Sequence, residues 1–114
     1  MNLFKKTFIV TGASSGIGAS LSKKLAQNGA NVVCAARRID KLEQIVSDIK
    51  SQGSTALAIQ ADITNLQHCQ SLVEKTILEY GQLDALVLNA GISMWTSFEK
   101  LDDVSFFREL METN

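Results

Sequence analysis

Three glycines lie between a short apolar segment and an amphipathic one, and this arrangement constrains the fold more than any other feature of the chain. The segment Phe8–Thr11 is a run of β-forming residues that ends at Gly12. After the glycines, Ile17, Leu21 and Leu25 recur every four residues, which is the spacing of one helix face. A strand, a glycine-rich turn and a helix in this order predict the start of a βαβ unit in a parallel sheet.

The rest of the chain continues the alternation of strand and helix. Further apolar strands are expected at residues 31–36, 55–61 and 83–89, and helices at residues 40–51 and from about 64 to near 81. Residues 92–101 are expected to form a loop, after which Asp102 or Asp103 begins a last helix. Short apolar strands separated by helices of this length predict an α/β protein.

Two of these helices carry start signals and an apolar face. Asp40 with Glu43, and Thr64 with Gln67, have the spacing of a capping box. The first of the two helices is expected to bury Leu42, Ile45, Val46 and Ile49. The second is expected to bury Leu66, Cys69, Val73 and Ile77.

The composition agrees with one globular domain over residues 1–114. Hydrophobic residues make up 46% of the chain and charged residues 20%, which argues against disorder. The formal net charge of −1 provides no broad basic surface for nucleic acid or anionic lipid. No apolar run approaches the ~20 residues of a membrane span, and the segment Met1–Lys6 lacks the apolar core of a signal peptide.

Side chains that could bind a metal are few and scattered. Cys34, Cys69 and the single histidine, His68, form no cluster with metal-ligand spacing. We therefore expect no metal site, and reduced thiols in a cytoplasmic protein.

The glycine turn has the composition of a dinucleotide-binding loop. Gly12 permits a tight turn, Gly16 lets a pyrophosphate approach bare backbone, and Gly18 lets the helix pack close to the sheet. The helix that follows offers free N–H groups and a partial positive charge to phosphates. The alternative is a glycine-rich turn that binds nothing, but strand, turn and helix stand in the order that a dinucleotide site requires. No Gly-Lys-Ser or Gly-Lys-Thr is present, which excludes a phosphate loop of the NTPase type.

The spacing of this turn is GxxxGxG, as TGASSGIG at Thr11–Gly18, and Asn89-Ala90-Gly91 follows the fourth strand. With Asp62 after the third strand and Asn114 in the last helix, these motifs resemble those of the short-chain dehydrogenase/reductase family, in the same order along the whole chain. The resemblance implies a Rossmann-like, doubly wound parallel sheet of strand order 3-2-1-4, truncated after the helix that follows strand four. That order leaves the outer edge of strand four without a neighbour. Family members are well over twice as long, so we interpret the chain as their amino-terminal, cofactor-binding half.

The resemblance also assigns cofactor contacts residue by residue. The pyrophosphate-binding loop corresponds to Gly12, Ser14, Ser15, Gly16, Ile17 and Gly18. Asp62, beside Ile63, corresponds to the aspartate that meets the adenine amino group; the alternative is that Asp62 only helps to start the helix at Thr64. Asn89, Ala90 and Gly91 correspond to a motif in which the asparagine stabilises the sheet and the small residues pass beside the nicotinamide ribose.

The end of the second strand bears on the choice between NAD and NADP. A nicotinamide enzyme that prefers NAD usually has an acidic residue there, which accepts from the ribose 2′-hydroxyl, whereas this chain has Ala36 followed by Arg37 and Arg38. A guanidinium holds a phosphate by paired charge-assisted bonds, and in the resembling family an arginine at the position of Arg37 marks NADP(H) users. We predict NADP(H) rather than NAD(H), with Arg37 as the main contact and Arg38 and Ser14 as helpers. The alternative is that both arginines are solvated residues at a helix start.

Asn114 falls on the apolar stripe of the last helix, with Phe107, Leu110 and Met111. A buried amide must find partners or cost about 1–3 kcal/mol. The resemblance implies an asparagine that helps to hold a water and the active-site lysine in a proton relay; the alternative is a wet, frayed helix end. By the same resemblance Trp95 walls the substrate pocket, unless it is a packing residue.

The chemistry that the resemblance implies is hydride transfer between the nicotinamide and a carbonyl or alcohol group of a small-molecule substrate, in an enzyme that is a homo-oligomer at full length. The catalytic groups are a serine and a Tyr-x-x-x-Lys motif, and the only tyrosine here, Tyr80, is followed four residues later by Asp84. We therefore expect the chain itself to lack reductase activity. The alternative is a stand-alone, non-catalytic module that binds nucleotides or regulates.

Overall fold

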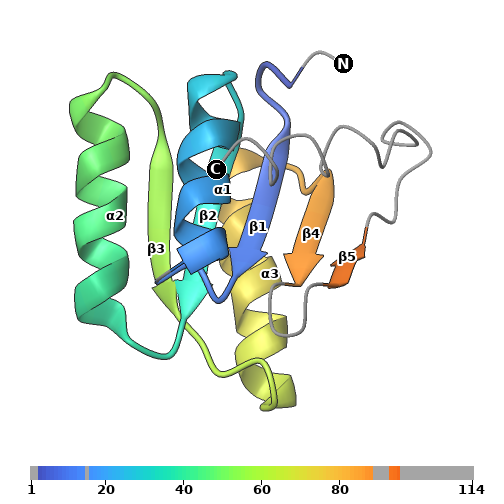
Figure 1. Cartoon of the computed structure of the whole chain (residues 1–114). Helices are drawn as coiled ribbons and strands as arrows, with labels where there is room; N and C mark the ends of the chain where they lie inside the picture. The colour runs from blue at the N-terminus through green and yellow to red at the C-terminus, as the bar shows by residue number, and fades with distance from the viewer. Residues whose placement is uncertain (1–2, 15, 89–92, 96–114) are drawn as a thin grey trace.

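The computed structural model describes residues 3–14, 16–88 and 93–95. These residues form one sheet with helices on both faces (Figure 1). The elements in chain order are β1 (Thr7–Thr11), α1 (Gly16–Gln27), β2 (Asn31–Ala36), α2 (Ile39–Ser51), β3 (Ala56–Gln60), α3 (Leu66–Tyr80), β4 (Ala85–Leu88) and β5 (Ser93–Trp95). The alternation predicted from β1 to β4 is confirmed.

The sheet has the strand order β3-β2-β1-β4-β5, with β1 in the middle. β1 pairs in parallel with both neighbours, so that Ile9 lies between Val33 of β2 and Leu86 of β4. β3 pairs in parallel with the other side of β2. The predicted order 3-2-1-4 and the Rossmann-like, doubly wound arrangement are therefore confirmed.

Alternate residues of the central strands face two separate core layers. Phe8 and Val10 of β1 belong to the layer that includes Leu25 of α1, whereas Ile9 belongs to the layer that includes Leu72 of α3. All five residues of β1 are buried. Full burial of an aliphatic or aromatic side chain of this size contributes about 1.5–3 kcal/mol, so helices on both faces are what an apolar strand of this kind requires.

The prediction of a loop over residues 92–101 is wrong for the part that the structure describes, because Ser93–Trp95 form the strand β5. This strand pairs antiparallel with β4, and Val87 lies opposite Met94. The outer edge of β4, expected to lack a neighbour, is therefore paired. A three-residue strand is too short to show a two-residue periodicity, but the backbone N–H and C=O groups along the edge of β4 still favour pairing.

The two capping boxes predicted from spacing are not formed. α2 begins at residue 39, and its N-cap, Arg38, makes no side-chain cap bond. α3 begins at residue 66, and its N-cap is Asn65, whose side chain accepts from the backbone N–H of His68. The hydroxyl and backbone N–H of Thr64 instead donate to the carboxylate of Asp62. Threonine and asparagine both cap helices well, so adjacent residues of these types make the first residue of a helix ambiguous in sequence.

The apolar face predicted for α3 is mostly wrong. Leu66 is 72% exposed, and Val73 and Ile77 are also exposed, whereas Leu72 and Thr76 are buried. The hydroxyl of Thr76 donates to the carbonyl of Leu72 at 2.7 Å, which satisfies its polar group within the helix. A threonine satisfied in this way can face the core, so the buried side of α3 is rotated from the one that apolar spacing alone selects.

Asp84 joins the start of β1 to the segment before β4. Its Oδ2 accepts from the backbone N–H of buried Thr7 at 2.8 Å, and its own N–H donates to the Thr7 carbonyl. Asp84→Ala should lower the free energy of unfolding by about 1–3 kcal/mol, because it leaves a buried N–H without its acceptor. Asp84→Asn keeps an oxygen in the same place and should cost less. Denaturant titration followed by circular dichroism measures both, and equal losses would contradict this role for the side chain.

Candidate functional site

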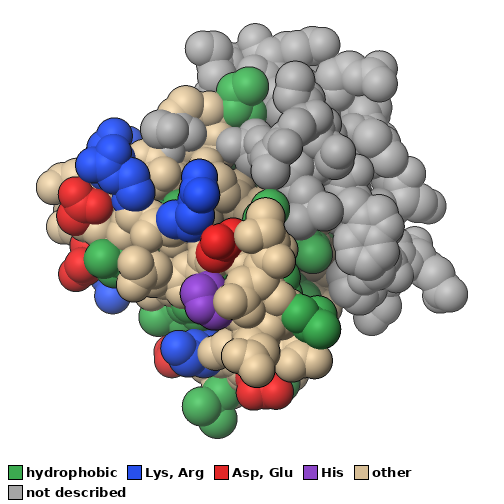
Figure 2. Space-filling model, turned by 90° about the horizontal axis from the view of Figure 1, so that it is seen from below, with side chains coloured by type: hydrophobic (Ala, Val, Ile, Leu, Met, Phe, Trp, Pro, Cys, Tyr) green, Lys and Arg blue, Asp and Glu red, His purple; other side chains and the backbone are tan. Residues whose placement is uncertain are grey.

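The loops that follow β1, β2 and β3 enclose a cavity of about 370 Å³ at the carboxyl ends of these strands. It is lined by Gly12, Ser14, Ala36, Arg37, Arg38, Ala61, Asp62, Ile63 and Thr64. Figure 2 views the molecule from this end and shows Lys and Arg side chains close to acidic side chains and to the histidine. Ligands of open parallel sheets bind in the crevice beyond this edge. Six of the residues predicted to bind a cofactor therefore line one cavity.

The glycine turn exposes bare backbone at the edge of this cavity. Gly12 and Gly16 have φ angles of 61° and 58°, in the left-handed region, and both are exposed. A Cβ at Gly16 would meet nothing within 4 Å, so glycine is required there by the backbone conformation and not by crowding. Gly18 is buried, and its carbonyl accepts from the hydroxyl of Ser22 at 2.8 Å. Ile17 is 46% exposed, which places it with the loop and not in the buried stripe of α1.

Two arginines follow the buried end of β2. Arg37 and Arg38 are both exposed, and the guanidinium of Arg38 lies 3.9 Å from the carboxylate of Asp40. Arg37 makes no ion pair with any acidic side chain in the part of the chain that the structure describes. Its backbone carbonyl accepts from the side-chain amide of Gln60 at 3.0 Å, which ties the turn after β2 to the end of β3. The arrangement presents one unpaired guanidinium at the rim of the cavity, where an anion could bind.

Asp62 also lines this cavity. Its Oδ1 accepts from the backbone N–H of Thr64 at 2.9 Å and from the Thr64 hydroxyl at 2.6 Å. These bonds lower the pKa of Asp62, and coulombic interactions with Arg37 and His68 lower it further by smaller amounts. Among the described residues no donor reaches Oδ2, so this oxygen can accept from a ligand. Asp62 thus helps to order the approach to α3, as one alternative predicted, and also keeps a free acceptor.

The sequence did not single out His68 or Asn65, which do not line the cavity but help to hold the loop that carries Asp62. The backbone N–H of Asp62 donates to Nδ1 of His68 at 3.0 Å, and Asn65 caps α3 by accepting from the backbone N–H of His68 at 3.1 Å. The thiol of Cys69 donates to the carbonyl of Ile63 at 3.3 Å. A polar residue three positions after a helix cap can reach back to the preceding loop, and that spacing is the signal that could have identified His68.

Five predicted site residues lie outside the described residues: Ser15, Asn89, Ala90, Gly91 and Asn114. Their assigned roles stay predictions. Trp95 is the last residue of β5, and its predicted place in a substrate pocket is likewise a prediction.

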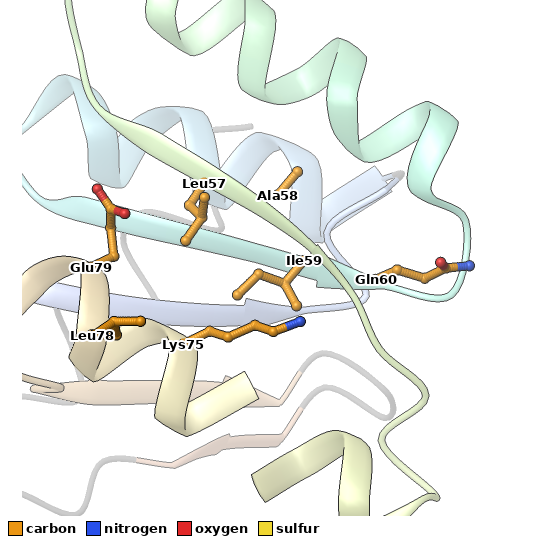
Figure 3. Close-up of a pocket in the computed structure, with 7 residues that line it drawn as sticks. All are labelled: Leu57, Ala58, Ile59, Gln60, Lys75, Leu78 and Glu79. Atoms are coloured by element: carbon orange, nitrogen blue, oxygen red, sulfur yellow. The ribbon is translucent and has the colours of Figure 1, made fainter. Parts of the chain in front are cut away.

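A larger hollow of about 460 Å³ lies beside β3 on the side of α3 and is lined by Leu57, Ala58, Ile59, Gln60, Lys75, Leu78 and Glu79 (Figure 3). Its walls are mainly aliphatic and it contains neither an exposed glycine backbone nor an arginine. Figure 3 shows Gln60 pointing away from it, toward the turn after β2. The smaller cavity therefore has the chemistry of a site, although it is not the larger of the two.

Residues 3–14, 16–88 and 93–95 do not indicate a metal site, a membrane-spanning helix or a reactive thiol at Cys34. They contain no group of three His, Cys, Asp or Glu side chains that could hold a metal ion, and no helix among them is long and apolar enough to cross a membrane. Burial raises the pKa of the Cys34 thiol to about 11, against a smaller lowering by its bond with Ser22. A thiol in this state is a poor nucleophile, so Cys34 is a core residue.

Comparison with known protein families gives a match over nearly the whole chain. The family model described as "short chain dehydrogenase" matches residues 6–114. The "Dehydrogenase/reductase SDR family protein 7-like" of Dictyostelium discoideum is 42% identical over 115 residues, which cover 96% of this chain and 36% of that protein. The chain spans about a third of the length of the curated relatives it matches.

Solved structures of similar fold include complexes with either nicotinamide cofactor. A 7α-hydroxysteroid dehydrogenase complexed with NADH and 7-oxo glycochenodeoxycholic acid matches with a TM-score of 0.73 and 34% identity, over 75% of this chain and 33% of that one. A metagenomic short-chain oxidoreductase in complex with NADP matches with a TM-score of 0.71 and 31% identity, over 75% of this chain and 39% of that one. These likenesses support a cofactor site and leave the choice between the two cofactors to the residues at the end of β2.

The cap of α3 can be tested through stability. Asn65→Ala removes the side-chain acceptor for the N–H of His68 and should lower the free energy of unfolding by about 0.5–2 kcal/mol. Asn65→Asp keeps an oxygen at that position and should retain most of the stability. Urea titrations of the two variants and the parent measure the difference. An Asn65→Ala variant as stable as the parent would show that another group caps the helix.

Proposed function

The chain belongs to the short-chain dehydrogenase family, and we propose that it is the NADP(H)-binding half of an oxidoreductase that transfers hydride to or from a carbonyl or alcohol group of a small molecule. One observation carries this proposal: exposed glycine backbone, an unpaired guanidinium and a free carboxylate oxygen line a single cavity at the carboxyl ends of β1, β2 and β3. These are the groups that meet pyrophosphate, 2′-phosphate and adenine, respectively.

The described residues suggest where each part of the cofactor binds. The pyrophosphate would lie against the turn from Gly12 to Gly18, where the N-terminus of α1 offers N–H groups and a partial positive charge. The adenine amino group would donate to Oδ2 of Asp62, with Ile63 beside the ring. We propose that Asn89, Ala90 and Gly91 lie beside the nicotinamide ribose. Asn114 is proposed to support the proton relay.

The preference for NADP(H) is argued from the end of β2. The side chain of Ala36 has no group that could accept from the 2′-hydroxyl of NAD, and Arg37 beside it makes no ion pair with an acidic side chain among the described residues. A 2′-phosphate placed there would receive charge-assisted bonds from Arg37, with Arg38 and Ser14 as further donors.

The second candidate function is a stand-alone module that binds nucleotide without catalysis, and it is favoured by the lack of a Tyr-x-x-x-Lys motif in these 114 residues. Loss of NADPH absorbance with a panel of ketones and aldehydes separates the two functions. We propose that the protein that carries this sequence is a homo-oligomer. Turnover of NADPH by that protein supports the oxidoreductase function. Tight NADPH binding without turnover supports the module.

Arg37→Ala tests the cofactor preference. Bonds to a charged group contribute about 1.5–3 kcal/mol, so this variant should bind NADP(H) roughly 10- to 150-fold more weakly, with little change for NAD(H). Lys41→Ala removes an exposed positive charge from α2 outside the cavity and should change neither affinity. Calorimetric titration of both cofactors measures the effect. Equal weakening of NAD(H) and NADP(H) by Arg37→Ala, or equal affinity of the parent for the two, would contradict the assignment.

A further inference from the structure

We propose that His68 is a positioning residue for adenine recognition: its imidazole holds the backbone of Asp62 so that the free carboxylate oxygen faces the adenine. This inference rests on the proposed function, because it concerns how the same cavity is shaped. His68 itself does not line the cavity. It acts through Asp62.

The position of His68 on α3 allows this contact. His68 is the third residue of the helix, after the cap Asn65, and its side chain turns back toward the loop instead of following the helix. There its Nδ1 accepts from the backbone N–H of Asp62 at 3.0 Å. The bond spans six residues, from the first turn of α3 to the end of β3.

The remaining groups of the loop are held by other bonds. The carbonyl of Asp62 accepts from the backbone N–H of Asn65 at 2.9 Å, its Oδ1 accepts from Thr64, and the carbonyl of Ile63 accepts from Cys69. On the strand side, the N–H of Ala61 donates to the sheet at 2.9 Å. The imidazole is thus the group that fixes the N–H of Asp62 itself, at the junction between the sheet and the loop.

The bond also defines the protonation state of the ring. A backbone N–H can only donate, so the Nδ1 that faces it must carry no proton, and the neutral ring holds its proton on Nε2. An acceptor at the position of Nδ1 is therefore the feature of this side chain that holds the loop.

Two substitutions separate the acceptor from the ring. Asn carries Oδ1 on its Cγ, where His carries Nδ1, so His68→Asn keeps an acceptor at that position. His68→Leu has no acceptor, and leucine favours helix at least as well as histidine. One neutral hydrogen bond corresponds to about a 2- to 12-fold change in Kd. We expect His68→Leu to weaken NADPH and NAD⁺ by equal factors in this range, because both carry the same adenine, and His68→Asn to bind both within about twofold of the parent.

Rescue of affinity by His68→Asn is the readout that a merely structural role of the ring would not give. NADPH and NAD⁺ are both used as probes on the protein that carries this sequence, because NAD⁺ carries the same adenine without the 2′-phosphate. A loss of affinity in His68→Asn equal to that in His68→Leu, or no loss of affinity in His68→Leu, would overturn the inference. If the parent binds neither cofactor, the proposed function fails as well. If the parent binds NADPH and the His68→Leu variant binds both cofactors as tightly as the parent does, this inference alone is overturned.

Discussion

The parallel pairing of β1 with both β2 and β4 is the constraint on which the rest of the structure depends. β1 is buried along its whole length, so its backbone groups must be satisfied by strands on both sides. Parallel pairing forces each connection to cross back over the sheet, which places α1 and α2 on one face and α3 on the other. The carboxyl ends of β1, β2 and β3 then meet at one edge, and their loops form the cavity (Figure 1).

The three loops at this edge contribute different chemistry because they are ordered in different ways. The turn after β1 is ordered by glycines in left-handed conformations and offers backbone. The turn after β2 is tied by Gln60 and offers a guanidinium. The loop after β3 is tied to the first turn of α3 by the side chains of Thr64, His68 and Cys69 and offers a carboxylate oxygen. In the proposed function, the first two loops would bind the phosphates of the cofactor and the third would bind its adenine.

Most of the fold could be predicted because the central strands β1 and β2 are buried on both faces and are therefore mostly apolar, and because Gly12 and Gly16 mark the turn that only glycine adopts readily. The buried face of α3 could not be predicted from apolar spacing, because Thr76 is a polar residue on that face. Its hydroxyl is satisfied by a hydrogen bond within the helix. β5 is too short for a periodic signal. The role of His68 depends on the direction of one ring nitrogen, which only the folded loop defines.

The most direct test of the proposed function is a crystal structure of the protein that carries this sequence with NADP⁺ bound. We predict the 2′-phosphate on the guanidinium of Arg37, the adenine amino group on Oδ2 of Asp62, and the pyrophosphate against the turn from Gly12 to Gly18. A cofactor bound in the aliphatic hollow beside β3, or a 2′-phosphate directed into solvent away from Arg37, would contradict it.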